Sequence, residues 1–273
     1  MSKRSRVWTN DKKRRYIQEG RGTGEGKEYM PWLRIQDFPS LGCATRILSN
    51  TTNRIHHFFS DLQTKCFYLW EWDKNVIDIR EHYPLLDLDT VINTNDINLD
   101  LFKDKKTGEN YVITTTFLLT VKMHSGDIKY FARSVKSKEQ LNKKITSEKL
   151  EIERRYWQAK GIHWAIITEE NIPAIKVKNI EWLHGVTSEY KDYGIESDEI
   201  VTLCSELLEF LSNKSIAVRK VLSMFDKENN LIAGTGIFLF KYLVISGVLE
   251  IDLNNEIDLG VNLENLLDDR REN

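Results

Sequence analysis

The sequence has little cysteine and no long apolar segment. Its three cysteines (Cys43, Cys66 and Cys204) stand far apart, and none forms the C-x-x-C pair of a zinc site or a redox motif. We therefore expect reduced thiols, no structural zinc and a cytoplasmic protein. No run approaches the ~18 uninterrupted apolar residues of a membrane-spanning helix. The basic start Met1–Arg6 lacks the apolar stretch of a secretory signal.

The composition that remains is that of a folded protein. The chain has 273 residues, of which 41% are hydrophobic and 29% are charged. These proportions exclude a largely disordered chain. The length suffices for one large domain or two ordinary ones.

The small net charge of −2 conceals an uneven distribution. Residues 1–28 contain nine lysines and arginines against four acids, whereas residues 186–273 contain eight against seventeen. A basic end attracts phosphate and an acidic end is repelled by it, so we predict a DNA-binding N-terminal arm and a protein-binding C-terminal domain. The alternative is that both segments are ordinary solvated surface. The residues predicted to bind DNA are Lys12, Lys13, Arg14, Arg15, Arg21 and Lys27.

Alternating glycines between Gly20 and Lys27 resemble a phosphate-binding loop only superficially. Lys27 is followed by Glu28 rather than serine or threonine, and no strand precedes the segment. We expect a flexible basic loop instead.

The middle of the chain alternates helical and strand patterns. Apolar residues recur at helical spacing from His57 to Trp72, and residues 76–80 form a short strand pattern. Residues 111–123 and 128–135 are rich in β-branched and aromatic residues around a turn, which predicts a hairpin. A long charged helix is expected from Lys138 to Lys160, followed by a strand at 163–167. This order predicts an α/β core with a mixed sheet flanked by helices.

The C-terminal third has a different pattern. After a connector at 170–196, Ser197, Ser215 and Thr235 are placed to cap three helices. Residues 248–253 and 256–261 are then expected to be two strands joined at Asn254–Asn255. Three helices followed by a hairpin predict a winged-helix-like α+β domain. Because this region is acidic, we expect it to dock on protein rather than DNA.

The core's order of helix, hairpin and second helix resembles the restriction-endonuclease-like fold. In such enzymes two or three carboxylates hold Mg²⁺, which polarises the phosphate and activates water, while a lysine orients that water. The expected organisation is a basic arm at 1–30, a restriction-endonuclease-like domain at 31–170 and the winged-helix-like domain at 171–273.

Five blocks of the sequence are distinctive: Gly20–Leu33, Arg54–Leu62, Asp78–Leu86, Glu151–Gln158 and Asn179–Leu183. They resemble the TnsA family, the endonuclease subunits of heteromeric cut-and-paste transposases. That resemblance implies cleavage of the 5′ strands at transposon ends in double-stranded DNA, and nucleoid association when in complex. It also implies a TnsB-like transposase that cuts and joins the 3′ strands. A TnsC-like AAA+ regulator would contact the C-terminal domain.

The positions that match the family's active site have mostly changed. The family's helix glutamate falls at Gln63, its strand aspartate at Thr116 and its Gln-x-Lys at Ser134 and Lys136. Lys136 is retained, and Glu153 matches an acid near the family's metal site. Neutral oxygens do not balance the charge of Mg²⁺, so binding of this cofactor is doubtful here.

Three hypotheses follow for the function. The first is a TnsA-like subunit defective in 5′-strand cleavage, acting in DNA binding, complex assembly and regulation. The second is an active endonuclease with a relocated metal site, built from Glu153 with Glu71, Asp73 or Asp78. The third is a decoy or repressor that titrates a regulator. The adjacent His56 and His57 are expected to make structural or DNA contacts rather than to share a metal.

Overall fold

The computed structural model of the chain describes residues 7–38, 44–186, 190–212 and 215–267. Residues 1–6 and Cys43, which figure in the expectations above, lie outside the described residues. The chain divides into two compact units, Met1–Ile172 and Pro173–Asn273, and each is described by itself. In the described residues, no helix is both long and apolar enough to cross a membrane.

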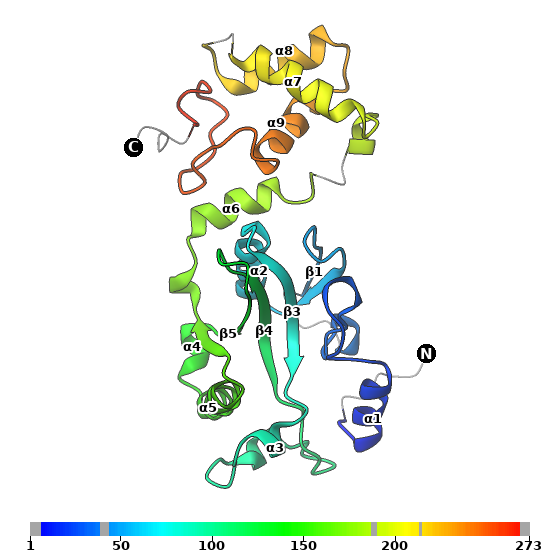
Figure 1. Ribbon diagram of the computed structural model, residues 1–273, viewed down its shortest axis with the longest axis vertical. Coiled ribbons are helices and arrows are strands. Elements are labelled where there is room, and N and C mark those ends of the chain that lie inside the picture. Colours follow the sequence, from blue (N-terminus) through cyan, green and yellow to red (C-terminus); the bar gives the residue numbers. More distant parts are fainter. Residues whose placement is uncertain (1–6, 39–43, 187–189, 213–214, 268–273) are drawn as a thin grey trace. The chain divides into compact units, whose positions relative to one another are not determined.

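A four-stranded mixed sheet forms the centre of unit 1 (Figure 1). Its strands are β3 (Val76–Pro84), β4 (Thr114–Lys122), β5 (Ile128–Val135) and β6 (His163–Ile167), in the order β3-β4-β5-β6. The first three are antiparallel, and β6 runs parallel to β5 because a helical crossover connects them. The predicted α/β core with a mixed sheet is therefore confirmed.

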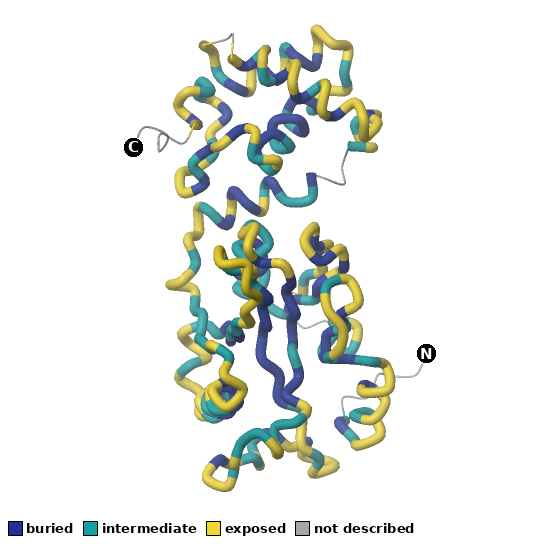
Figure 2. The backbone as a smooth tube through the Cα atoms, viewed as in Figure 1, coloured by how far each residue is buried: buried dark blue, intermediate teal, exposed yellow. Residues whose placement is uncertain are grey.

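Both faces of the sheet are covered, which explains why β3 and β4 are buried almost throughout (Figure 2). On one face Phe117 packs against Trp70 of α2 (Asp61–Trp72), with ring centroids 4.8 Å apart. On the other face Leu118 and Ala132 share an apolar cluster with Trp157 of α5 (Lys144–Ala159). A strand buried on both faces has a continuous apolar pattern, as residues 111–123 do.

The helix predicted from His57 is wrong at its beginning. A hairpin of β1 (Thr45–Leu48) and β2 (Ile55–Phe58) precedes it, and α2 begins only at Asp61. The Ser60 hydroxyl accepts a hydrogen bond from Gln63 N and thereby caps the helix. This cap sets the first residue of α2, whereas the apolar spacing by itself extends the predicted helix back into β2.

The single helix predicted from Lys138 to Lys160 is two helices. The short α4 (Lys138–Leu141) has a capping box between Ser137 and Gln140, and α5 begins after Lys143. The remaining short elements of unit 1 are α1 (Asn10–Gln18) and α3 (Leu88–Val91), with 3-10 turns at Gly26–Glu28, Ile35–Asp37, Leu99–Phe102 and Glu169–Asn171.

The segment around α1 is folded onto unit 1. Trp8, Tyr16 and Trp32 form a buried aromatic cluster with edge-to-face rings. The glycine-rich loop after α1 packs tightly: a Cβ at Gly22 would lie 2.2 Å from Pro84 Cγ. Its φ of 81° is also a conformation that glycine adopts without strain. The expected flexible loop is therefore a packed turn that needs its glycine.

Unit 2 is α-rich. It contains α6 (Ala174–Leu183), a 3-10 turn at Tyr190–Tyr193, α7 (Glu199–Ser212), α8 (Val218–Glu228) and α9 (Thr235–Ile245). The three predicted helices are thus present, although the caps are displaced: Ala217 and Gly234, not Ser215 and Thr235, precede α8 and α9. Close approach of α8 and α9 requires Gly236, because a Cβ there would lie 2.8 Å from Leu222 O.

The two strands predicted at 248–253 and 256–261 are wrong. Backbone groups that a hairpin would pair are used elsewhere: Val218 N donates to Val261 O, and the Asn179 side chain donates to Leu253 O. In the described part of this segment, an isolated bridge joins Ile251 to Leu267. The connector expected at 170–196, with one or two helical turns at Asn179–Leu183, contains the longer, ten-residue α6.

Candidate functional site

The end of β5 brings together most of the residues that the TnsA resemblance singled out. Ser134 pairs with Ile166 in the sheet, and its side chain faces Glu153 on α5. Thr116 lies opposite, where its hydroxyl accepts a hydrogen bond from Val135 N at 3.0 Å. Lys136 immediately follows the strand, and its own N–H donates to Ile167 O. We call Gln63, Thr116, Ser134, Lys136, Lys149 and Glu153 the inherited site.

Glu153 is almost fully buried, with a side-chain exposure of 1%. The Ser134 hydroxyl donates a hydrogen bond to Glu153 Oε2, and Trp164 Nε1 donates to the Ser134 oxygen at 2.9 Å. Lys149 Nζ lies 3.7 Å from the other carboxylate oxygen. Both oxygens of this acid therefore have partners within the protein.

Lys149 is a member of the site that the sequence analysis missed. It is four residues before Glu153, a spacing that places both side chains on the same face of a helix. That spacing could have revealed it. Burial, followed by the nearby charge of Lys149, lowers the pKa of Lys136 to about 8, although Glu153 opposes the shift. Two lysines therefore lie close to one carboxylate.

Gln63 lies in the first turn of α2. Its Oε1 accepts a hydrogen bond from Phe59 N at 2.9 Å. In the described residues, no hydrogen bond or ion pair joins it to Thr116, Ser134 or Glu153. The amide oxygen of Gln63 is thus used to hold the preceding turn.

The donors of the inherited site do not fit Mg²⁺. Its side-chain oxygens come from one carboxylate, one amide and two hydroxyls, and the carboxylate is already paired with a lysine. Mg²⁺ gives up its water only for strongly charged oxygen ligands in near-octahedral arrangement. Within the described residues, no group of three or more histidine, cysteine, aspartate or glutamate side chains is arranged to hold a metal.

The acids considered for a relocated metal site have other contacts. Glu71 accepts hydrogen bonds from Ser49 Oγ and Asn50 N, so it holds the turn of the β1–β2 hairpin. Asp73 accepts from Asn75 N, and Asp78 Oδ2 lies 3.3 Å from Arg80 Nε. None has a hydrogen bond or ion pair to Glu153 in the described residues.

A second buried cluster lies between β2 and β3. Arg54 donates two hydrogen bonds to the carboxylate of Glu81, at 2.9 and 2.5 Å, and His56 Nδ1 lies 2.9 Å from Glu81 Oε2. Burial raises the pKa of Glu81, but the charges of His56 and Arg54 outweigh it and hold the pKa well below its usual value. We call these three residues the Arg54 cluster. The structural role expected for the histidine pair thus applies to His56.

His82 is a buried histidine that follows Glu81 of the Arg54 cluster. Its backbone has a φ of 51°, its Nε2 donates to His57 O at 2.8 Å, and its ring lies 4.9 Å from that of Phe59. Burial lowers the pKa of His82 to about 4, with a smaller lowering effect from Lys149. His82 is therefore neutral at physiological pH.

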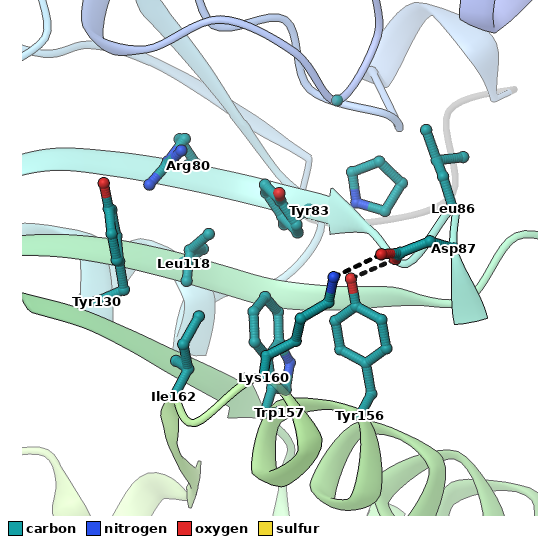
Figure 3. Close-up of a pocket in the computed structure, with 12 residues that line it drawn as sticks. Arg80, Tyr83, Leu86, Asp87, Leu118, Tyr130, Tyr156, Trp157, Lys160 and Ile162 are labelled. Carbon is teal, nitrogen blue, oxygen red and sulfur yellow. Dashed lines mark hydrogen bonds and ion pairs between the residues drawn. The ribbon is translucent and has the colours of Figure 1, made fainter. Parts of the chain in front are cut away.

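A separate cavity of about 340 Å³ opens on the α5 side of the sheet (Figure 3). At one end Asp87 accepts hydrogen bonds from Tyr156 and Lys160, and Arg80 and Tyr130 lie at the other. Members of the inherited site are not among the residues that line it. The residues that line the cavity are Gly22, Arg80, Tyr83, Pro84, Leu86, Asp87, Leu118, Tyr130, Tyr156, Trp157, Lys160 and Ile162.

The basic residues predicted to bind DNA divide into two groups. Arg21 is buried, where it pairs with Asp37 at 2.5 Å and lies 3.5 Å from the centre of the Tyr16 ring. Its charge is therefore used within the fold. Lys12 and Lys13 are half-buried. The exposed ones are Arg14, Arg15 and Lys27.

Comparisons with known proteins agree with this architecture. Residues 73–169 match the family described as TnsA-like endonuclease N terminal, and residues 171–253 match TnsA endonuclease C terminal. The chain is 41% identical over 202 residues to the Transposon Tn7 transposition protein TnsA of Escherichia coli. The match covers 73% of this chain and 70% of that protein. On this evidence, the chain belongs to the TnsA family of transposase endonuclease subunits.

Proposed function

We propose that this chain is a TnsA-family subunit that has lost Mg²⁺-dependent cleavage of the 5′ strands at transposon ends. The observation that carries the proposal is the state of Glu153. The one carboxylate of the inherited site is buried and already satisfied by Ser134 and Lys149. Gln63 and Thr116 are neutral, and their side chains accept hydrogen bonds within the protein.

The function that remains is DNA binding, assembly and regulation of the transposition complex. Exposed Arg14, Arg15 and Lys27 would contact the backbone of double-stranded DNA, since cations on one segment neutralise neighbouring phosphates. The acidic unit 2 would dock on a TnsC-like AAA+ regulator, and the chain would act beside a TnsB-like transposase. If 3′ joining proceeds without 5′ cleavage, the element copies itself into a cointegrate instead of excising.

Strand-resolved cleavage tests this proposal. The purified chain is incubated with its partner transposase, end-labelled donor DNA and Mg²⁺ or Mn²⁺, beside the variant Gln63→Glu/Thr116→Asp/Ser134→Gln. We expect intact 5′ strands with the unmodified chain and cut 5′ strands with the restored variant. Cleavage of 5′ strands by the unmodified chain, abolished by Glu153→Gln, would establish an active nuclease instead.

A further inference from the structure

The inherited site contains a surplus of positive charge. Lys149 is partly accessible, with 24% of its side chain exposed, and it lies 3.7 Å from Glu153. Lys136 is half-buried close enough to Lys149 for their charges to interact. In the described residues, no hydrogen bond or ion pair is found for the Lys136 ammonium. Two cations therefore share one anion.

A metal-dependent nuclease site has the opposite balance. There, several carboxylates create negative charge, and the divalent cation neutralises it and contacts the phosphate. Here positions 63, 116 and 134 are neutral, so a divalent cation has little negative charge to neutralise. The ammonium group of Lys149, beside Glu153, supplies the positive charge that a divalent cation supplies in such a nuclease site.

We propose that Lys149 replaces the divalent cation, and that Lys149 and Lys136 together bind a phosphate of the DNA backbone without metal. Glu153 would not repel that phosphate strongly, since its two oxygens are engaged by Ser134 and Lys149. Glu153, which accepts a hydrogen bond from the Ser134 hydroxyl on β5, instead holds Lys149 in place on α5. Each ammonium has three N–H donors and suits the oxygens of a phosphodiester. The inference rests on the proposed function, because it places DNA at the inherited site.

Fluorescence anisotropy with a fluorescein-labelled DNA duplex tests the inference, using the full chain in the presence of EDTA. The variants are Lys149→Gln, Lys136→Gln and the charge-retaining Lys149→Arg. Lys144→Gln is the matched control, because it removes an exposed lysine from the same helix. Thermal unfolding verifies that each variant is folded.

We expect EDTA to leave the affinity of the unmodified chain unchanged. Lys149→Gln and Lys136→Gln should each weaken binding about tenfold. Each should also reduce the slope of log affinity against log salt by about 0.9, the value for one lost phosphate contact. Lys149→Arg should retain most of the affinity, and Lys144→Gln should weaken binding less than either.

Two results would overturn the inference. One is loss of affinity on adding EDTA, which would show that a metal bridges the DNA. The other is equal affinity and salt slope for Lys149→Gln, Lys136→Gln and the Lys144→Gln control. Nicking of the same duplex in Mg²⁺ is measured in parallel. Nicking by the unmodified chain would contradict the proposed loss of cleavage. The affinities measured in EDTA separately test phosphate binding by Lys149 and Lys136.

Discussion

Two buried clusters of unit 1 differ in how their charge is balanced. In the Arg54 cluster, Glu81 receives two hydrogen bonds from Arg54 and lies beside His56, so the anion is fully paired. In the inherited site, one glutamate faces two lysines. The first cluster joins β2 to β3 and stabilises the scaffold. The second contains the positions that the resemblance to the TnsA family predicts for a metal site.

The fold is complete without a set of carboxylates at the inherited site. The sheet and the helices on both its faces are present although positions 63, 116 and 134 carry neutral side chains. Two of these side chains accept local hydrogen bonds, Gln63 from Phe59 N and Thr116 from Val135 N. A scaffold held by such contacts does not depend on the chemistry of its site.

The largest effect is expected from breaking the Arg54 cluster. Glu81→Gln keeps the shape but removes the anion, and it leaves Arg54 buried with an unbalanced charge. Removing one partner of a buried ion pair costs about 3–5 kcal/mol of unfolding free energy. Chemical denaturation measures this cost. Glu109→Gln, at a half-buried side chain that accepts a hydrogen bond from Asn10, is the control and should change the free energy by under about 1 kcal/mol. A similarly small effect for Glu81→Gln would contradict a stabilising role.

Lowering the pH should destabilise the folded protein, because it protonates the buried His82. The pKa of His82 is about 4 in the folded protein against an ordinary value of 6.5. Its unfolded form therefore binds the proton more tightly, and stability is lost as pH falls from 6.5 towards 4. The loss from this group amounts to about 3 kcal/mol.

The variant His82→Asn sharpens this prediction, because asparagine also tolerates the positive φ at this position. Unfolding free energies measured from pH 7 to pH 4 should fall less steeply for this variant than for the unmodified chain. The matched control is His124→Asn, at an exposed turn, and it should keep the full dependence. If the unfolding free energies of both variants fall equally steeply with pH, His82 is excluded as the source of the pH dependence.

A smaller effect is expected within the inherited site. Ser134→Ala removes the donor to Glu153 Oε2 and the acceptor of the Trp164 N–H. Leaving buried polar groups unpaired costs about 1–3 kcal/mol. Thermal denaturation should show this loss, while Ser147→Ala on the exposed face of α5 should shift stability by less than about 0.5 kcal/mol. If both variants melt alike, the hydroxyl does not support Glu153.

Strong local patterns made most of the fold predictable from the sequence. The β-branched run at 111–123 predicted β4, and the apolar stripe through Leu207 and Leu211 predicted α7. The boundaries failed where side-chain contacts decide them, as Ser60 does for α2. The strands expected at 248–261 failed because Asn179 and Val218, distant in sequence, pair with that backbone.

The site was predictable only in part. The family motifs singled out Thr116 on β4 and Ser134 and Lys136 at the end of β5, and their proximity to Glu153 was expected from the family. Lys149 was missed because it lies outside the sequence blocks that carry the resemblance, although its spacing from Glu153 was visible. The pairing of Arg54 with Glu81 spans 27 positions along the chain, a separation that no local pattern encodes.

Isothermal titration of Mg²⁺ and Mn²⁺ tests directly whether the inherited site binds a divalent metal. The unmodified chain is compared with the variant Gln63→Glu/Thr116→Asp/Ser134→Gln, in which the family's metal-binding side chains are restored. We expect no saturable heat for the unmodified chain and saturable binding for the restored variant. Comparable saturable binding by the unmodified chain would contradict the proposed loss of metal binding and indicate a functioning metal site.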